Sequence, residues 1–493
     1  MLMRLSRNAF VREYGPYTYI RDRNGNQDYM FKGAAPFFKH IDRAPRDETE
    51  IVARITAEFE NCDIATIRSD FTAMIDPLVE RGLIVRGNSS EELNGADCVW
   101  FSYKDDGQWV IDEDDKPITE AEFKGMPQCV LGDYFRKNPT LFDLQLDITQ
   151  ACTERCIHCY VPEYNPLFLP YDKCCEVMRE FRTMGGLMIG FSGGECMMHP
   201  DFKRLVEFAR NQDLIVSVLS NLTLCDDSMV QLLKDNQAFV QVSLYSMDSA
   251  IHDGITQRKG SWAKTKSAIE RLHGADVPMR ISCPTMRQNY DGYLDVLKYA
   301  EGLRIPAQTD FIMMAKADHD KSNLDNRLSL AQTKSLLEMV INDNLPAESE
   351  YFDPKHKEDL KTPEERSEEP LCGAGVDKLC LNANGNYYPC SGFQDYAVGN
   401  CFKQSLRDVW ENSPRLRYIR GLRGKDISKC IHCENRNYCS MCLVRNYNET
   451  GDMLKVADHF CKVAALNREV VEDFHRKLIN RAKLQKEGRR YDM

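Results

Sequence analysis

The stretch that decides the fold is Ile148-Thr-Gln-Ala-Cys-Thr-Glu-Arg-Cys-Ile-His-Cys-Tyr160, which spaces Cys152, Cys156 and Cys159 as C-x3-C-x2-C. A four-iron cluster needs four ligands, so an array of three thiolates leaves one iron open to a further ligand. A structural zinc ion is normally held by four protein ligands. The spacing therefore indicates a metal centre with an open position, and a zinc site or unrelated buried thiols are the alternatives.

From Leu141 onward, strands alternate with helices, a pattern typical of an α/β fold with a parallel sheet. The expected strands are residues 142–148, 187–191, 214–219, 239–244, 278–283 and 307–313. The first of them runs directly into the cysteine loop. The cysteines are thus expected beyond the C-terminal end of a strand, where barrel enzymes keep their active sites.

The loop after the second strand reads Ser192-Gly-Gly-Glu-Cys196. Glycines let the backbone approach a ligand closely, and the carboxylate of Glu195 can accept charge-assisted hydrogen bonds from an ammonium group. Gly-Gly-Glu by itself is a common turn. Its place one strand–helix unit after the cysteines favours a ligand-binding role.

The cysteine spacing together with the Gly-Gly-Glu loop resembles the radical S-adenosylmethionine (radical SAM) superfamily. The resemblance implies a partial (β/α)6 TIM barrel in which the three cysteines hold a [4Fe-4S] cluster. In that family the free iron binds SAM, and one electron cleaves it to a 5′-deoxyadenosyl radical. The residues implied to contact SAM are His158, Tyr160, Gly193, Gly194, Glu195, Ser220, Asn221 and Ser243.

Two of these assignments depart from the family or have an ordinary alternative. Ser220-Asn221-Leu222 stands where relatives commonly carry Thr-Asn-Gly, and Ser243 is equally consistent with a plain strand serine. The segment from His252 to Trp262 resembles one found in peptide-modifying members of the family. His252 itself is more simply interpreted as a histidine at a helix start that makes a local bond.

Further cysteines beyond Leu371 resemble the SPASM pattern C-x9–15-G-x4-C…C-x2-C-x5-C-x3-C…C, with Gly385 as its glycine. The resemblance implies two auxiliary [4Fe-4S] clusters. One would be held by Cys430, Cys433, Cys439 and Cys461, and the other by Cys372, Cys390 and Cys442.

The SPASM resemblance has one departure, because Cys439 and Cys442 are separated by two residues where the pattern has three. This leaves open how the two cysteines divide between the clusters, and it leaves unsettled the fourth ligand of the cluster held by Cys372, Cys390 and Cys442. Cys380 and Cys401 are expected to be buried packing residues. Zinc stays an alternative here, because paired C-x2-C motifs are common zinc ligands.

The first ninety residues read as a small unit of short strands followed by helices, a winged-helix-like pattern. Strands are expected at 17–20 and 28–31, and helices over 48–59 and up to Gly82. The pattern resembles the PqqD type of peptide-recognition domain, in which a leader peptide pairs with a sheet edge. A DNA-binding winged helix or a structural cap is the alternative, and the acidic balance disfavours contact with phosphates.

The composition narrows the class of protein. The chain of 493 residues carries a net charge of −11 and 20 cysteines, and no segment reaches the length of a membrane span. We expect a cytoplasmic protein with several domains, reduced thiols, and neither nucleic acid nor membrane as a partner.

The predicted organisation divides the chain into six parts, and we expect a mixed α/β architecture throughout. These are a PqqD-like domain (1–87), a linker with a hairpin near 99–111 (88–140), a radical SAM partial barrel (141–330), a bridging region (331–370), a SPASM domain (371–467) and a C-terminal helix or tail (468–493).

The function expected from these features is modification of a ribosomally made precursor peptide with a leader, most simply through a thioether or carbon–carbon cross-link. The family also implies an electron donor such as flavodoxin or ferredoxin. Peptide epimerisation, maturation of a protein as in anaerobic sulfatase activation, and a zinc-stabilised regulatory protein are the alternatives. No side chain is assigned as a catalytic acid or base.

Overall fold

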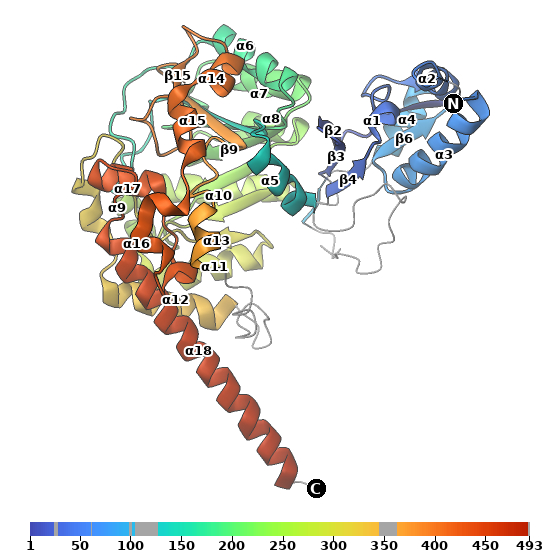
Figure 1. Cartoon of the computed structure of the whole chain (residues 1–493). Coiled ribbons are helices and arrows are strands. Elements are labelled where there is room, and N and C mark those ends of the chain that lie inside the picture. The colour runs from blue at the N-terminus through green and yellow to red at the C-terminus, as the bar shows by residue number, and fades with distance from the viewer. Residues whose placement is uncertain (24–27, 61, 98–100, 104–126, 345–361, 492–493) are drawn as a thin grey trace.

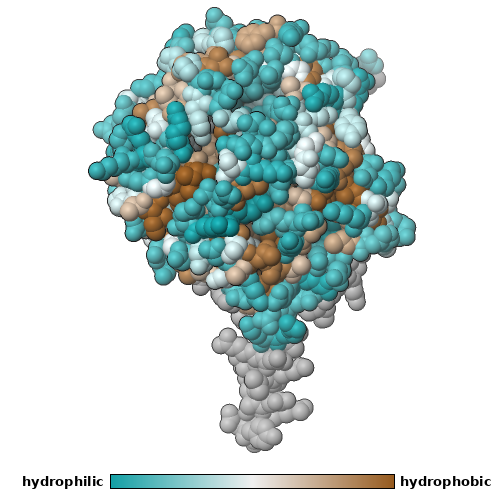
Figure 2. Space-filling view, turned by 90° about the vertical axis from the view of Figure 1, so that its left-hand side faces the viewer, coloured by the Kyte–Doolittle hydropathy of each residue, from teal (hydrophilic) through white to brown (hydrophobic). Residues whose placement is uncertain are grey.

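The computed structural model describes residues 1–493 except 24–27, 61, 98–100, 104–126, 345–361 and 492–493. A smaller N-terminal unit lies beside a larger α/β body, with helix α5 (Pro127–Lys137) between them (Figure 1). None of the helices within the described residues combines the length and apolar character needed to cross a bilayer. The face drawn in Figure 2 is mostly hydrophilic and carries scattered hydrophobic patches.

The body is built on a nine-stranded sheet in the order β12-β11-β10-β9-β8-β7-β13-β14-β15. Six consecutive parallel strands form the predicted partial barrel, and the predicted fold is confirmed. These strands are β7 (Asp143–Thr149), β8 (Met188–Gly193), β9 (Ile215–Ser220), β10 (Phe239–Ser243), β11 (Met279–Ser282) and β12 (Ala307–Gln308).

Helices follow the barrel strands in turn. They are α6 (Tyr171–Thr183), α7 (Phe202–Asn211), α8 (Asp227–Asp235), α9 (Ser249–Thr256), α10 (Ser261–Gly274), α11 (Tyr293–Gly302) and α12 (Leu330–Asn344). Their apolar faces pack on the outward side chains of the strands, such as Leu144, Leu146 and Ile148, which are fully buried.

The sixth strand is shorter than the expected 307–313, because β12 ends at Gln308. It pairs with β11 on one side only. The carboxylate of Asp310 then accepts a hydrogen bond from the Ile312 N–H (3.0 Å), a local turn that competes with continued pairing.

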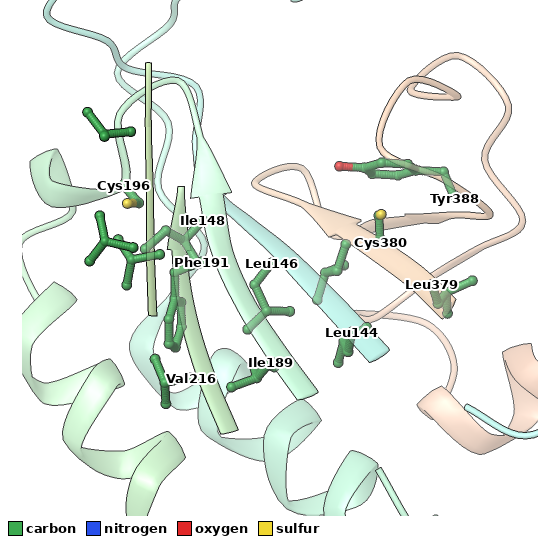
Figure 3. Packing of buried hydrophobic residues seen from close by; sticks show 14 of the residues in the cluster. Leu144, Leu146, Ile148, Ile189, Phe191, Cys196, Val216, Leu379, Cys380 and Tyr388 are labelled. Atoms are coloured by element: carbon green, nitrogen blue, oxygen red, sulfur yellow. The ribbon is translucent and has the colours of Figure 1, made fainter. Parts of the chain in front are cut away.

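Strand β13 (Lys378–Asn382) extends the barrel sheet from a distant part of the sequence. It lies parallel to β7, with Cys380 opposite Gln145, and continues antiparallel into β14 (Asn386–Tyr388) and β15 (Gly399–Asn400). Cys380 and Tyr388 lie on the face of the sheet opposite Leu144 and Leu146 (Figure 3). The predicted SPASM region therefore shares its sheet with the barrel.

The hydroxyl of Tyr388 donates a hydrogen bond to the Asp147 carboxylate at this junction. The other oxygen of Asp147 accepts from the side-chain amide of Gln145 (2.8 Å). Burial raises the pKa of Asp147, and the bond from Tyr388 opposes that shift. Both side chains are buried, so the pair joins β7 to β14 inside the molecule.

Replacing Tyr388 by Phe is expected to lower the free energy of unfolding by about 1–3 kcal/mol, because it leaves the buried Asp147 carboxylate without its hydroxyl partner. Denaturant titration followed by circular dichroism measures the change. Tyr418→Phe, at an exposed position on the helix Pro414–Gly421, is the control. Equal stability of Tyr388→Phe and the native chain would contradict the expectation.

The N-terminal unit contains two three-stranded sheets, in the orders β5-β1-β6 and β2-β3-β4. The two strands expected near residues 17 and 28 are β3 and β4, whereas β1 and β2 were not predicted. The bounds are β1 (Leu2–Leu5), β2 (Ala9–Tyr14), β3 (Tyr17–Asp22), β4 (Asp28–Lys32), α1 (Ala35–Phe38), β5 (Arg46–Asp47), α2 (Glu48–Thr56), α3 (Ile64–Glu80) and β6 (Ile84–Gly87).

The segment predicted as a linker, 88–140, contains two packed helices where it is described. Helix α4 (Ser90–Ala96) begins at a Ser89 cap and buries Leu93, and α5 buries Leu131 and Phe135. The polar composition of this segment hid both helices from sequence-based prediction, because each helix has only one narrow apolar face. The hairpin predicted near 99–111 lies almost wholly outside the described residues.

The C-terminal part differs from its predicted boundaries. Within the described residues, the predicted bridging region carries nearly all of α12 as well as α13 (Pro363–Glu368). A single helix, α18 (Asp458–Tyr491), runs through the predicted boundary at 467/468. The SPASM region also contains α14 (Leu406–Asn412), α15 (Pro414–Gly421), α16 (Ser428–Ile431) and α17 (Leu443–Thr450).

Candidate active site

The cysteine loop follows β7 directly at the C-terminal edge of the barrel. Backbone hydrogen bonds from Arg155 to Thr256 (2.9 Å) and from Ile157 to Ile255 (3.0 Å) fasten it to the end of α9. Cys152, Cys156 and Cys159 are each half-buried. The segment that begins at His252 therefore has a structural task that its sequence did not reveal, because it holds the cysteine loop in place.

The three thiols lie within electrostatic reach of one another. Burial, Glu195, Glu154 and Cys159 together raise the pKa of Cys152 to about 12, although a backbone hydrogen bond lowers it. Burial, Glu154 and the other two thiols raise the pKa of Cys156 well above its usual value. Three soft sulfur donors in one loop suit an iron–sulfur cluster.

The glycines of the predicted second motif bring the β8 loop against the cysteine loop. Gly193 has φ +130°, and a Cβ there would lie 2.3 Å from the Thr149 carbonyl oxygen. A Cβ on Gly194 would lie 2.3 Å from the Ala151 carbonyl oxygen. Both positions therefore require glycine because backbone packs closely against backbone there.

Glu195 is 1% exposed, and three donors of the chain already bind its carboxylate. It accepts hydrogen bonds from the Ser220 hydroxyl (2.8 Å), the Asn221 N–H (2.8 Å) and the Met197 N–H (3.1 Å). Burial raises the pKa of Glu195, while these donors lower it. The carboxylate thus links the β8 and β9 loops. The sequence predicted only a contact with an ammonium group and not this structural role.

Asn221 connects the β9 loop to the cysteine loop. Its side-chain amide donates to the Thr153 hydroxyl (2.9 Å) and lies 4.0 Å from the Cys152 sulfur. Three loops that follow β7, β8 and β9 are thereby linked by side chains that the sequence had assigned to SAM. Their contact with SAM stays a prediction.

The remaining predicted SAM contacts lie around the same edge. Burial lowers the pKa of His158 to about 4, so its ring is neutral, and it meets the Tyr245 ring edge-on at 5.1 Å. Ser243 ends β10 and is half-buried. Burial raises the pKa of the Tyr160 hydroxyl, and so do Asp147, Cys159, Cys380 and Cys390. Tyr160 therefore lies between the cysteine loop and the SPASM region.

Sequence reasoning missed Glu154, which lies between the first two cysteines and is 3% exposed. Burial raises its pKa to about 7, and its carboxylate is 3.4 Å from the Cys156 sulfur. A glutamate in a loop is normally solvated, so composition gave no signal of this burial. Asp147 was missed for the same reason.

The seven SPASM cysteines form two groups. Burial raises the pKa of Cys372 to about 11, and the neighbouring Cys442 and Cys390 add to this shift. A backbone hydrogen bond to Cys372 opposes the shift. Burial, Cys439 and Cys461 raise the pKa of Cys430, whereas burial, Cys461 and Cys433 raise that of Cys439. Cys439 is thus an electrostatic neighbour of Cys430, Cys433 and Cys461, and Cys442 of Cys372 and Cys390. Their roles as ligands and their division between two clusters stay predictions.

Cys380 and Cys401 are 3% and 5% exposed, in keeping with packing residues. Within the described ranges, no three or more His, Cys, Asp or Glu side chains gather in a group that could hold a single metal ion.

Three family models match the chain in separate regions. The model described as "Radical SAM superfamily" matches residues 146–300, and the "Iron-sulfur cluster-binding domain" named SPASM matches residues 372–442. The model for "Coenzyme PQQ synthesis protein D (PqqD)" matches residues 33–84. These matches confirm the three resemblances drawn from the sequence.

Similar proteins span most of the chain at low identity. An "AdoMet-dependent heme synthase" of Methanosarcina barkeri is 26% identical over 334 residues, which are 63% of this chain and 93% of that protein. The "Antilisterial bacteriocin subtilosin biosynthesis protein AlbA" of Bacillus subtilis is 24% identical over 383 residues, 73% of this chain and 81% of that protein.

Among solved structures, Streptococcus suis SuiB bound to the precursor peptide SuiA has a TM-score of 0.59 at 16% identity. The likeness covers 93% of this chain and 99% of SuiB. At this identity it establishes the fold that the two chains share.

Proposed function

Because this chain carries a radical SAM domain, a SPASM iron–sulfur domain and a PqqD domain, we propose that it modifies a ribosomally made precursor peptide. When bound, a [4Fe-4S] cluster supplies the electron that cleaves SAM to a 5′-deoxyadenosyl radical. The observation that carries the proposal is the joining of the cysteine, Gly-Gly-Glu and Asn221 loops at one barrel edge. A cross-link within the peptide is the proposed product.

The residues proposed to hold this cluster are Cys152, Cys156 and Cys159. Glu195 and Asn221 hold the surrounding loops in register, so that SAM would meet a preorganised site. The proposed ligands of the two auxiliary clusters are the two groups of SPASM cysteines, Cys430, Cys433, Cys439 and Cys461, and Cys372, Cys390 and Cys442.

The inner face of the barrel supports a polar substrate such as a peptide. Gln145, Ser217, Gln241 and Arg280 all lie on this face and are half-buried. The Arg280 guanidinium donates to the Gln241 side chain (2.7 Å), and its Nε has no hydrogen-bond partner in the described structure. These donors and acceptors can bind backbone amides of an extended segment.

The leader of the precursor is proposed to pair with strand β4. In the sheet β2-β3-β4 both outer strands are edges, and β2 lies against the barrel through Arg12 and Tyr14. Strand β4 is the other edge, and an edge strand can add a peptide as a further strand.

Hydrogen–deuterium exchange tests this pairing on the full chain. Adding a precursor peptide, to be sought as a short open reading frame next to the gene, is expected to slow amide exchange in Asp28–Lys32 more than in Ala9–Tyr14. The same peptide without its leader is the control and should give no protection. Protection confined to other segments would refute the assignment of β4.

Co-expression with that precursor, followed by mass spectrometry, tests the function itself. A cross-link removes two hydrogens, so we expect a loss of about 2 mass units per modification, by hydrogen counting for a reaction of this cofactor class. An unchanged mass with solvent deuterium incorporated would indicate epimerisation instead. A processed folded protein, with the precursor untouched, would favour the alternative of protein maturation.

We further propose a small acidic electron carrier such as flavodoxin or ferredoxin as the reductant, and a cytoplasmic location. Reduction of the purified enzyme by such a carrier, measured by 5′-deoxyadenosine formation, tests the first of these.

A further inference from the structure

The N-terminal unit contacts the base of the barrel, the edge formed by the N-terminal ends of its strands. Gly185 and Gly186 lie just before β8, and Asp213 lies just before β9. The Arg12 Nε donates to the Gly186 carbonyl (2.9 Å), and the Tyr14 hydroxyl donates to that of Gly185 (3.0 Å).

Asp213 is the shared acceptor of this contact. One carboxylate oxygen accepts from Arg43 Nε (2.7 Å) and the other from Arg12 Nη1 (3.0 Å). The Arg12 side chain is only 2% exposed. Burial raises the pKa of Asp213, but the charges of Arg43 and Arg12 outweigh burial and hold this pKa below its usual value. The carboxylate is therefore ionised at neutral pH and neutralises two arginines of the N-terminal unit.

Further bonds surround this ion group. The Gln237 side chain donates to that of Asn8 (2.6 Å), and Arg210 donates to the Arg7 carbonyl (2.8 Å). Phe10 has the guanidinium groups of Arg43 and Arg210 each 4.8 Å from its ring centre.

An apolar cluster accompanies the polar contacts and draws on several parts of the chain, Val376 of the SPASM region among them. It includes Phe10, Tyr14, Tyr19 and Met30 of the N-terminal unit, Leu131 and Phe135 of α5, and Leu187 and Ile215 of the barrel. The unit is thus bound to the barrel by a shared core as well as by ions.

The base and the cysteine loop lie at opposite ends of the barrel strands. Strand β7 has seven residues. At about 3.3 Å per residue it separates the two ends by roughly 23 Å. An extended peptide covers at most about 3.6 Å per residue, so at least about six or seven residues are needed to pass from one end to the other.

We propose that the Asp213 contact clamps the recognition domain to the barrel base and thereby fixes which residue of the precursor reaches the radical site. This inference rests on the proposed function. Asp213, Arg12 and Arg43 are positioning residues that act through the docked domain. Because β4 belongs to the sheet that Arg12 and Tyr14 fasten, a leader bound to β4 is held at a constant distance from the cysteine loop.

Asp213→Asn is the variant that tests the clamp, because asparagine tolerates the left-handed backbone found there (φ +57°), while it removes the charge and one of the two acceptor oxygens that bind the arginines. Asp276→Asn is the matched control. Asp276 has φ +56° in the equivalent turn before β11, and its carboxylate accepts from the Tyr103 N–H and the Ser102 hydroxyl.

Hydrogen exchange of Ala9–Tyr14 in the full-length protein is the first readout. Asp213→Asn is expected to speed it by about tenfold or more, since the buried Arg12 and the half-buried Arg43 lose their counter-charge. Asp276→Asn should leave that segment unchanged. Equal exchange in Asp213→Asn and the native chain would overturn the clamp.

The second readout is the position of the modification in precursors that carry insertions of three or six residues between leader and core. The native enzyme should modify the residue at a constant distance from the leader, whereas Asp213→Asn should modify several positions. Position selection that is the same in both proteins would overturn the positioning role. A native enzyme that modifies neither these peptides nor the precursor without an insertion would refute the proposed function, while the exchange data still decide the clamp.

Discussion

Replacing Cys156 by Ala is expected to abolish SAM cleavage and to lower the iron content of the anaerobically purified protein by about four of about twelve atoms. Two remaining thiols in a half-buried loop supply too few ligands for a four-iron cluster. The Cys156 thiol also donates to the Glu154 carboxylate (3.4 Å) and accepts from the Tyr245 hydroxyl (3.8 Å), so its loss leaves both groups without that partner.

Iron and sulfide analysis together with 5′-deoxyadenosine measured by liquid chromatography checks this result. Cys62→Ala is the matched control, because Cys62 is exposed and lies outside the three arrays. Full cleavage activity in Cys156→Ala would contradict the cluster assignment. Stoichiometric zinc in the native protein, without iron, would instead favour the zinc-stabilised alternative.

Glu195→Gln is expected to slow SAM cleavage by about a hundredfold while the iron content is retained, which corresponds to about 2.7 kcal/mol. Each oxygen of Glu195 accepts at least one hydrogen bond from the chain. A glutamine amide would place an NH2 group against one of those donors, and glutamine has one acceptor oxygen where the carboxylate has two. An unmatched buried donor costs free energy, and this cost would favour separation of the β8 and β9 loops.

The initial rate of 5′-deoxyadenosine formation checks the expectation, with iron content measured on the same sample. Glu176→Gln on α6 is the control, because that carboxylate is on the surface and pairs with Lys173 (2.6 Å). An unchanged rate in Glu195→Gln would show that the loop contact has no part in forming the SAM site.

The sequence predicted the barrel and its cysteine edge well, because both rest on local patterns. Five of the six expected strands agree closely with β7 to β11, and the sixth was too long because Asp310 begins a turn. The linker prediction failed where α4 and α5 bury narrow apolar faces. The Gly-Gly-Glu motif suggested a ligand for Glu195. It could not reveal the hydrogen-bond donors that the neighbouring loop supplies to the same carboxylate.

What the sequence determined by itself was the presence of three cysteine arrays, the Gly-Gly-Glu loop and the strand–helix alternation, since metal-ligand spacing and hydrophobic periodicity act between residues close in the chain. Only the tertiary structure decided which distant groups meet. Tyr388 bonds Asp147 across 241 residues, and Arg12 reaches Asp213 across 201. Such contacts depend on sheet order and on the burial of charge, and neither leaves a periodic signal in the sequence.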